Sequence, residues 1–207
     1  MKEKLPWDNL KQYLPDGSLD YVLPLILKHK LHLTVTQPRH SKLGDYRLPN
    51  RPYENHKITV NGNLNKYEFL ITLLHELAHM LAFVQYGRTI LPHGKEWQNI
   101  FSELLIPTID YKYFPTDIEQ ELKHTIASPA ASCAGEIGLI RVLKKYNSTY
   151  NKNLIHIEDV PHGALFKTEE GEVFKIEKKM RTRYLCYHIN SNKKYSFPAL
   201  YNVALVK

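Results

Sequence analysis

Cysteine is scarce in this sequence. Cys133 and Cys186 are the only two among 207 residues and form no CxxC pair, so the sequence does not imply a disulfide framework. Long uncharged apolar runs are also missing: the segment 21–27 is short and contains Pro24, whereas a membrane-spanning helix needs about 20 apolar residues. The N-terminus lacks the apolar core of a secretory signal. We therefore expect a cytoplasmic protein without a membrane segment.

Positive charge is distributed unevenly along the chain, whose net charge is +7. Residues 1–140 carry 15 Lys and Arg against 15 Asp and Glu, whereas residues 141–207 carry 13 against 6. Such an asymmetry is typical of a protein half that contacts a polyanion, most often nucleic acid. A solvated basic surface that keeps the protein soluble explains the same charge, and both interpretations stay open at this point.

The apolar pattern predicts an α+β fold. Alternating residues predict strands at 31–36, 45–48 and 57–60, ahead of a long helix. Helices are predicted at 19–30, 65–86, 95–105, from 116 onwards and at 132–146, with chain breaks at Pro107 and Pro115. After the polar stretch at Asn147, strands are predicted at 165–166, 173–176, 183–189, 195–197 and 203–206. We expect a small antiparallel sheet packed on helices within a domain of residues 1–146, followed by a small β-rich C-terminal unit at 147–207.

The helix predicted at 65–86 carries the sequence His75-Glu76-Leu77-Ala78-His79. Residues four apart project from one helical face, so the two imidazoles can bind one ion. Zinc suits this arrangement because it accepts neutral imidazoles and keeps an open water position beside three protein ligands. Glu76 is placed to take a proton from that water. The structural alternative is a pair of satisfied core histidines, but such polar groups are costly in an apolar helix.

A third ligand needs a separate argument. The metzincin arrangement is excluded because Ala82 and Gln85 stand where that class has Gly and His. His93 follows the helix stop at Gly87, and a loop of about seven residues can return it to the ion. The alternatives are Glu96, Glu103 and His124. The residues alone favour His93 and leave these alternatives open.

The sequence HELAH, followed by His93-Gly94-Lys95-Glu96-Trp97, resembles the SprT-like metalloprotease family, which includes bacterial SprT proteins and eukaryotic Spartan proteases. That family pairs HExxH with a later His-Gly and an aromatic residue, here Trp97. The resemblance extends upstream through residues 42–47 and 57–60 and covers roughly residues 15–110. It implies one Zn²⁺ held by His75, His79 and His93, with Glu76 as the catalytic residue. It also implies hydrolysis of protein substrates bound or cross-linked to DNA, so that single-stranded or damaged DNA is a candidate partner.

The C-terminus departs from the family pattern, because many members end in a zinc ribbon that this chain has too few cysteines to build. A metal-free β unit is expected instead. Its cations and aromatic residues could neutralise phosphates and stack on bases. The residues predicted to bind nucleic acid are Lys178, Lys179, Arg181, Arg183, Tyr184, Tyr187, Lys193 and Lys194. Aromatic residues that simply fill the core of the sheet explain the same pattern.

Two other functions are compatible with these residues. One is a nucleic-acid-binding protein with a structural or vestigial metal site, although a structural site has no use for an open position. The other is a zinc hydrolase that acts on something other than peptides.

Overall fold

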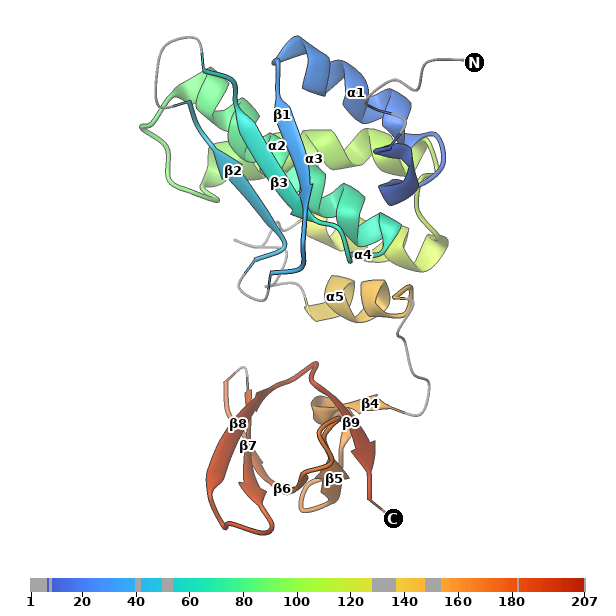
Figure 1. The fold of residues 1–207 in the computed structure, drawn as a ribbon, viewed down its shortest axis with the longest axis vertical. Coiled ribbons are helices and arrows are strands. Elements are labelled where there is room, and N and C mark those ends of the chain that lie inside the picture. Colours follow the sequence, from blue (N-terminus) through green and yellow to red (C-terminus); the bar gives the residue numbers. More distant parts are fainter. Residues whose placement is uncertain are drawn as a thin grey trace. The chain divides into compact units, whose positions relative to one another are not determined.

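The computed structural model describes residues 7, 9–39, 42–49, 54–127, 137–147, 154–181 and 183–206. The chain divides into two compact units, Met1–Ser148 and Thr149–Lys207, each described here by itself. Among the described residues, the first unit contains five α-helices and a three-stranded sheet, and the second contains a six-stranded sheet (Figure 1). The predicted α+β class is confirmed. The division lies close to the boundary expected between residues 146 and 147.

The first unit is built on a small sheet of β1 (His32–Thr36), β2 (Gly44–Arg47) and β3 (Lys57–Asn61). The strand order is β1-β3-β2, in which β3 runs parallel to β1 and antiparallel to β2. The sheet is therefore mixed rather than purely antiparallel as expected. The central strand is β3, whose Ile58 and Val60 are fully buried, and β1 and β2 are the edge strands. Alternation within a strand reports which face is buried, but not which neighbour the strand pairs with.

The central helix α2 (Lys66–Tyr86) packs against β2 and β3 and against the next helix, α3 (Lys95–Asp110) (Figure 1). The α2 helix begins as predicted: the Asn65 side-chain oxygen accepts hydrogen bonds from the backbone N–H groups of Tyr67 (3.1 Å) and Glu68 (3.0 Å). It ends at Gly87, whose φ of 71° favours glycine. By length and composition α2 is the one helix among the described residues that could cross a membrane. However, 61% of its most apolar window is buried inside the fold, as in a core helix.

The remaining helices of the first unit are α1 (Ser18–Lys28), α4 (Thr116–Ala127) and α5 (Ile137–Lys144), preceded by a short 3-10 turn, η1 (Lys11–Tyr13). The break predicted at Pro107 is wrong, since α3 continues to Asp110 and the backbone N–H of Tyr111 donates to the Pro107 carbonyl at 2.9 Å. Proline removes one helical hydrogen bond, and burial of Leu105, Thr108 and Ile109 holds the last turn in place. Residues 128–136, with the expected start of the last helix, lie outside the described residues.

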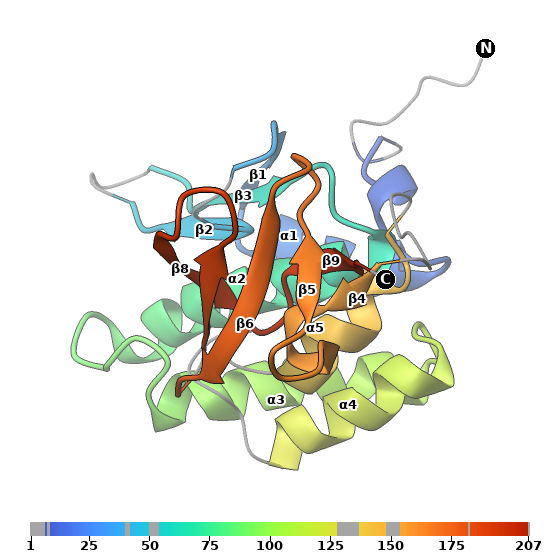
Figure 2. The same cartoon turned by 90° about the horizontal axis from the view of Figure 1, so that it is seen from below.

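The second unit is a sheet of six strands, and every pairing described in it is antiparallel. The strands are β4 (Ile155–His156), β5 (Leu165–Lys167), β6 (Val173–Lys179), β7 (Arg183–His188), β8 (Lys194–Pro198) and β9 (Asn202–Leu205). A short 3-10 turn, η3 (Ile157–Asp159), follows β4. The order is β4-β9-β5-β6-β7-β8, and the sheet curls around its own core of Phe166, Phe174 and Cys186 (Figures 1 and 2). The expected β-rich C-terminal unit is therefore present.

Candidate metal centre

Two of the predicted ligands lie one turn apart on α2. The Nε2 atoms of His75 and His79 are 3.3 Å from each other. Both side chains are half-buried, because the helix positions around them pack in the core of the unit. The spacing of four residues therefore does what the sequence predicted and directs both rings to one point.

The third histidine comes from the loop between α2 and α3. His93 Nε2 lies 3.1 Å from His75 Nε2 and 3.0 Å from His79 Nε2. The His93 backbone has a φ of 59°, and its carbonyl accepts a hydrogen bond from Gln98 Nε2 at 3.1 Å. A Cβ at Gly94 would lie 2.9 Å from the Leu91 carbonyl, so the glycine permits the tight turn that presents His93.

Among the described residues, His75, His79 and His93 form the one cluster whose ligand atoms could hold a metal ion. The alternative third ligands Glu96, Glu103 and His124 are described in the structure but do not belong to it.

The three imidazoles are held in the neutral form that binds metals. Burial, followed by the charges of the other two rings, lowers the pKa of His75 to about 3. Burial and the neighbouring His93 lower the pKa of His79 to about 4, and burial lowers that of His93. Protons therefore do not compete with a metal ion for these nitrogens near neutral pH.

Two aromatic rings, Trp97 and Phe101, pack beside the three histidines. The Trp97 ring, 1% exposed, lies 4.6 Å from the His75 ring, 5.2 Å from the His79 ring and 4.7 Å from the His93 ring, measured between centroids. Phe101 stacks on Trp97, with 5.0 Å between the ring centroids. The aromatic residue of the His-Gly motif thus packs against all three candidate ligands and restricts their orientation.

Glu76 follows His75 on α2 and is buried, with 8% of its surface exposed. Its carboxylate accepts a hydrogen bond from the backbone N–H of Tyr46 on β2. Burial, followed by the negative charge of Asp45, raises the pKa of Glu76 to about 7, although this hydrogen bond and the cations of Lys42 and Arg39 oppose the shift. A carboxyl group with this pKa can both accept and release a proton near neutral pH.

The edge strand β2 lies against Glu76 at a glycine. A Cβ added at Gly44 would lie 2.6 Å from Glu76 Oε1 and 2.8 Å from both Glu76 Cγ and Thr72 Cγ2. A glycine is therefore needed at position 44 because no side chain fits between the backbone of β2 and Glu76, and not because the backbone angles are unusual. The sequence carries little signal for this contact, because it joins segments that are far apart in the chain.

The loop leading into β2 is held by one buried side chain. Asn61, 1% exposed, donates from Nδ2 to the carbonyl oxygens of Arg39 (3.1 Å) and Lys42 (3.0 Å). Its Oδ1 accepts from Arg39 Nε at 2.8 Å, and its backbone N–H donates to the Leu43 carbonyl at 2.9 Å. Asn61 therefore holds Arg39, Lys42 and Leu43 in place, and with them the position of β2 over Glu76. No pattern in the sequence singles out Asn61 for this role.

Comparison with known proteins agrees with this geometry, since the SprT-like family matches residues 22–127, just over half of the chain. The chain belongs to the SprT-like family. Among curated proteins it is 46% identical over 41 residues to Protein SprT of Glaesserella parasuis serovar 5 (strain SH0165), a stretch covering 19% of this chain and 26% of that protein. The chain thus spans about a quarter of the length of this relative. No solved structure matches the chain significantly.

The SprT-like match contains all four predicted residues of the metal centre and leaves the second unit outside. That unit holds the residues predicted to bind nucleic acid. Tyr184 is 8% exposed and belongs to the core, which corrects the expectation that it stacks on bases. The others are exposed or half-exposed: Lys178, Lys179, Arg181, Arg183, Tyr187, Lys193 and Lys194.

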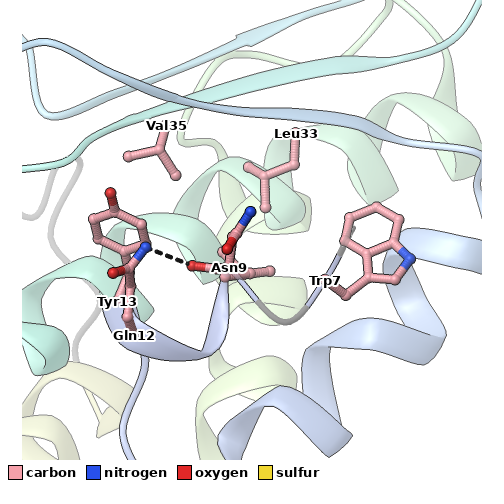
Figure 3. Close-up of a pocket in the computed structure, with 7 residues that line it drawn as sticks. Trp7, Asn9, Gln12, Tyr13, Leu33 and Val35 are labelled. Atoms are coloured by element: carbon pink, nitrogen blue, oxygen red, sulfur yellow. Dashed lines mark hydrogen bonds between the residues drawn. The ribbon is translucent and has the colours of Figure 1, made fainter. Parts of the chain in front are cut away.

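A separate pocket of the SprT-like unit lies away from this chemistry. It has a volume of about 480 Å³ and runs beside the edge strand β1, between Leu33 and Val35 and the N-terminal residues Trp7 and Tyr13 (Figure 3). Gln12 Nε2 donates to the Asn9 carbonyl at its rim (3.0 Å). The described residues that line it include no histidine, carboxylate or thiol.

Proposed function

We propose that this SprT-like chain is a zinc-dependent peptidase in which His75, His79 and His93 hold one Zn²⁺ and Glu76 transfers the proton. The observation that carries the proposal is the convergence of three Nε2 atoms within 3.0–3.3 Å of one another. Glu76, the residue that follows His75 on α2, is buried.

The spacing of the nitrogens supports zinc. Tetrahedral zinc with bonds of about 2.0–2.1 Å separates its ligand nitrogens by about 3.3 Å. The three separations of 3.0, 3.1 and 3.3 Å fit that requirement closely, and the lowered pKa values keep the rings neutral. Among the described residues the cluster has three members, which corresponds to a catalytic site with an open position rather than to a closed structural site.

Each residue then has a defined task. Bound here, the ion would supply the Lewis acidity that polarises a peptide carbonyl and lowers the pKa of water. Glu76 accepts the proton of the attacking water and delivers it to the leaving amine, for which a pKa of about 7 is suited. Trp97 and the tight turn at Gly94 keep the imidazoles oriented.

The substrates proposed here are proteins bound or cross-linked to DNA, in a cytoplasmic setting. The resemblance to the Spartan branch supports this class, and so does the excess of cations after residue 140. The competing function is nucleic-acid binding with a vestigial metal site. A buried Glu76 with a raised pKa argues against it, because a vestigial site has no need to keep such a costly group.

Cleavage and metal content test the proposal together. We expect one zinc per chain in the wild type and in Glu76→Gln, with cleavage of an unfolded protein lowered by roughly 10²–10⁴-fold in the variant. His79→Ala should lose the metal. Glu103→Gln removes an exposed carboxylate from α3 and serves as the matched control, with unchanged cleavage.

Two results would contradict the peptidase proposal. One is wild-type cleavage by Glu76→Gln. The other is a zinc-loaded wild type that cleaves no unfolded or DNA-bound protein, which would favour the binding function. Hydrolysis of an ester or amide substrate without peptide cleavage would favour a different zinc hydrolase.

A further inference from the structure

Charge is polarised within the second unit. Residues 173–206, which form β6 to β9, hold seven Lys and Arg against one acidic residue, Glu177. Residues 154–172, which form β4 and β5, hold one Lys or Arg against five Asp and Glu. The basic character is therefore a property of one part of this sheet and not of the unit as a whole.

Four of these seven cations, Lys175, Lys178, Arg183 and Lys194, lie on one face of β6, β7 and β8. Side chains alternate along a strand, and Phe174, Ile176 and Cys186 point into the core. Their neighbours consequently lie on the opposite, outer face. The register places Lys175 opposite Tyr187 and Tyr187 opposite Lys194. It also places Lys178 opposite Leu185 and Leu185 opposite Ser196.

The outer face has an aromatic and apolar centre between these cations. Tyr187 and Leu185 are half-exposed on β7, the middle of the three strands. Lys194 Nζ lies 5.2 Å from the centroid of the Tyr187 ring, a cation–π distance. Arg183 extends the basic row by hydrogen bonding to Ser196 Oγ at 2.6 Å. The single acid of the face, Glu177, accepts a hydrogen bond from the Tyr187 hydroxyl at 3.3 Å.

We infer that the outer face of β6, β7 and β8 binds single-stranded nucleic acid, with Lys175, Lys178 and Lys194 on phosphates and Tyr187 stacked on a base. A flexible single strand can place its phosphates on the row of cations and stack an unpaired base on the half-exposed ring. A duplex or an anionic membrane would use the charge alone. A strand of six residues spans about 20 Å, enough for several nucleotides.

The inference adds a partner surface to the proposed peptidase. It rests on the proposed function only for the biological role of the surface, and not for the binding itself. Binding is measured on the full chain without a protein substrate, and cleavage of an unfolded protein is measured without nucleic acid. Failure of one is therefore distinguishable from failure of the other.

The test is fluorescence anisotropy with labelled oligothymidine of about 20 nucleotides, between about 50 and 200 mM salt. Parallel titrations use oligouridine, a duplex of equal length and vesicles containing phosphatidylserine. The patch variant combines Lys175→Ala, Lys178→Ala and Lys194→Ala. The matched control removes the same charge from exposed lysines of the first unit, and combines Lys11→Ala, Lys28→Ala and Lys123→Ala.

We expect the patch variant to bind the oligonucleotide at least tenfold more weakly than the control variant. The slope of log affinity against log salt should fall by about 2, since each single-strand phosphate contact contributes roughly 0.7. Tyr187→Ala should weaken binding by at least about fivefold and Tyr187→Phe by less than about twofold, because stacking uses the ring. Thermal melts of all variants separate these effects from misfolding.

Several results would overturn the inference: equal affinity of the patch and control variants, equal loss in Tyr187→Phe and Tyr187→Ala, or binding of the duplex as tight as that of the single strand. Binding confined to the anionic vesicles would also overturn it. Tighter binding of either oligothymidine or oligouridine than of the duplex supports it, and the ratio of the two identifies DNA or RNA as the preferred strand.

Discussion

Gly44→Ala tests whether the contact between β2 and Glu76 sets the rate of peptide cleavage. The new methyl group would lie 2.6 Å from Glu76 Oε1, whereas ordinary contacts begin at 3.4 Å, so the carboxylate has to retreat by roughly 0.8 Å. Thr72 Cγ2 at 2.8 Å blocks a shift of the methyl group itself. Misplacement of a catalytic group by about 1 Å costs up to about 10²-fold in rate. We therefore expect kcat/KM to fall by about 10–100-fold, and stability by about 1–3 kcal/mol.

The assay separates misplacement of Glu76 from general overpacking. Zinc content, kcat/KM on an unfolded protein, and the urea midpoint are measured for Gly44→Ala and for Gly62→Ala. The Gly62 substitution also places a methyl group 2.8 Å from a neighbour, in this case Val35 Cγ1, and it does not touch Glu76. Both variants should lose comparable stability and keep one zinc, but only Gly44→Ala should lose activity. Wild-type kcat/KM in a folded, zinc-loaded Gly44→Ala protein would refute the reasoning, as would equal losses in the two variants.

Two further predictions concern groups that support the site. In the metal-free protein the pKa of Glu76 is raised from 4.5 to about 7. Between pH 4.5 and 7 the folded chain therefore keeps a proton on Glu76 that the unfolded chain releases. The wild type loses stability as the pH rises through this range. Urea denaturation in chelator should find Glu76→Gln more stable than wild type by up to about 3 kcal/mol at pH 8 and by less than about 1 kcal/mol at pH 5, and a pH-independent difference would contradict the shift. Asn61→Ala leaves the Arg39 and Lys42 carbonyls without their donor and should cost about 2–4 kcal/mol with a lower kcat/KM. An unchanged urea midpoint would show that the loop before β2 does not depend on Asn61.

The parts of the fold predictable from the sequence are those specified by local chemistry. The long helix was predictable because Asn65 caps its start, Gly87 ends it and its interior is apolar at helical spacing. The pairing of β1 with β3 was not, because a parallel pair joins segments separated by the whole of β2 and no local residue encodes it. Pro107 was misread since proline disfavours helix locally, whereas packing of the last turn of α3 decided the outcome.

The candidate site divides in the same way. His75 and His79 follow from helical spacing, but His93 needed a family resemblance because a loop can place its residue in many positions. The approach of Gly44 to Glu76 and the role of Asn61 depend on contacts between distant segments, and a single sequence does not reveal them. Tyr184 was misassigned because both faces of β7 carry apolar or aromatic residues, so that the pattern of this strand does not tell which face is buried.

The apolar character of α2 has a consequence for any attempt to reduce the protein to a minimal fragment. In the unfolded chain this 21-residue segment exposes its leucines and phenylalanines to other chains, and it is hidden only when β2, β3 and α3 pack around it. Those partners come from both sides of the helix in the sequence. We therefore expect a peptide that contains HELAH alone to self-associate instead of presenting two imidazoles, and the metal centre to assemble only when the first unit folds as a whole.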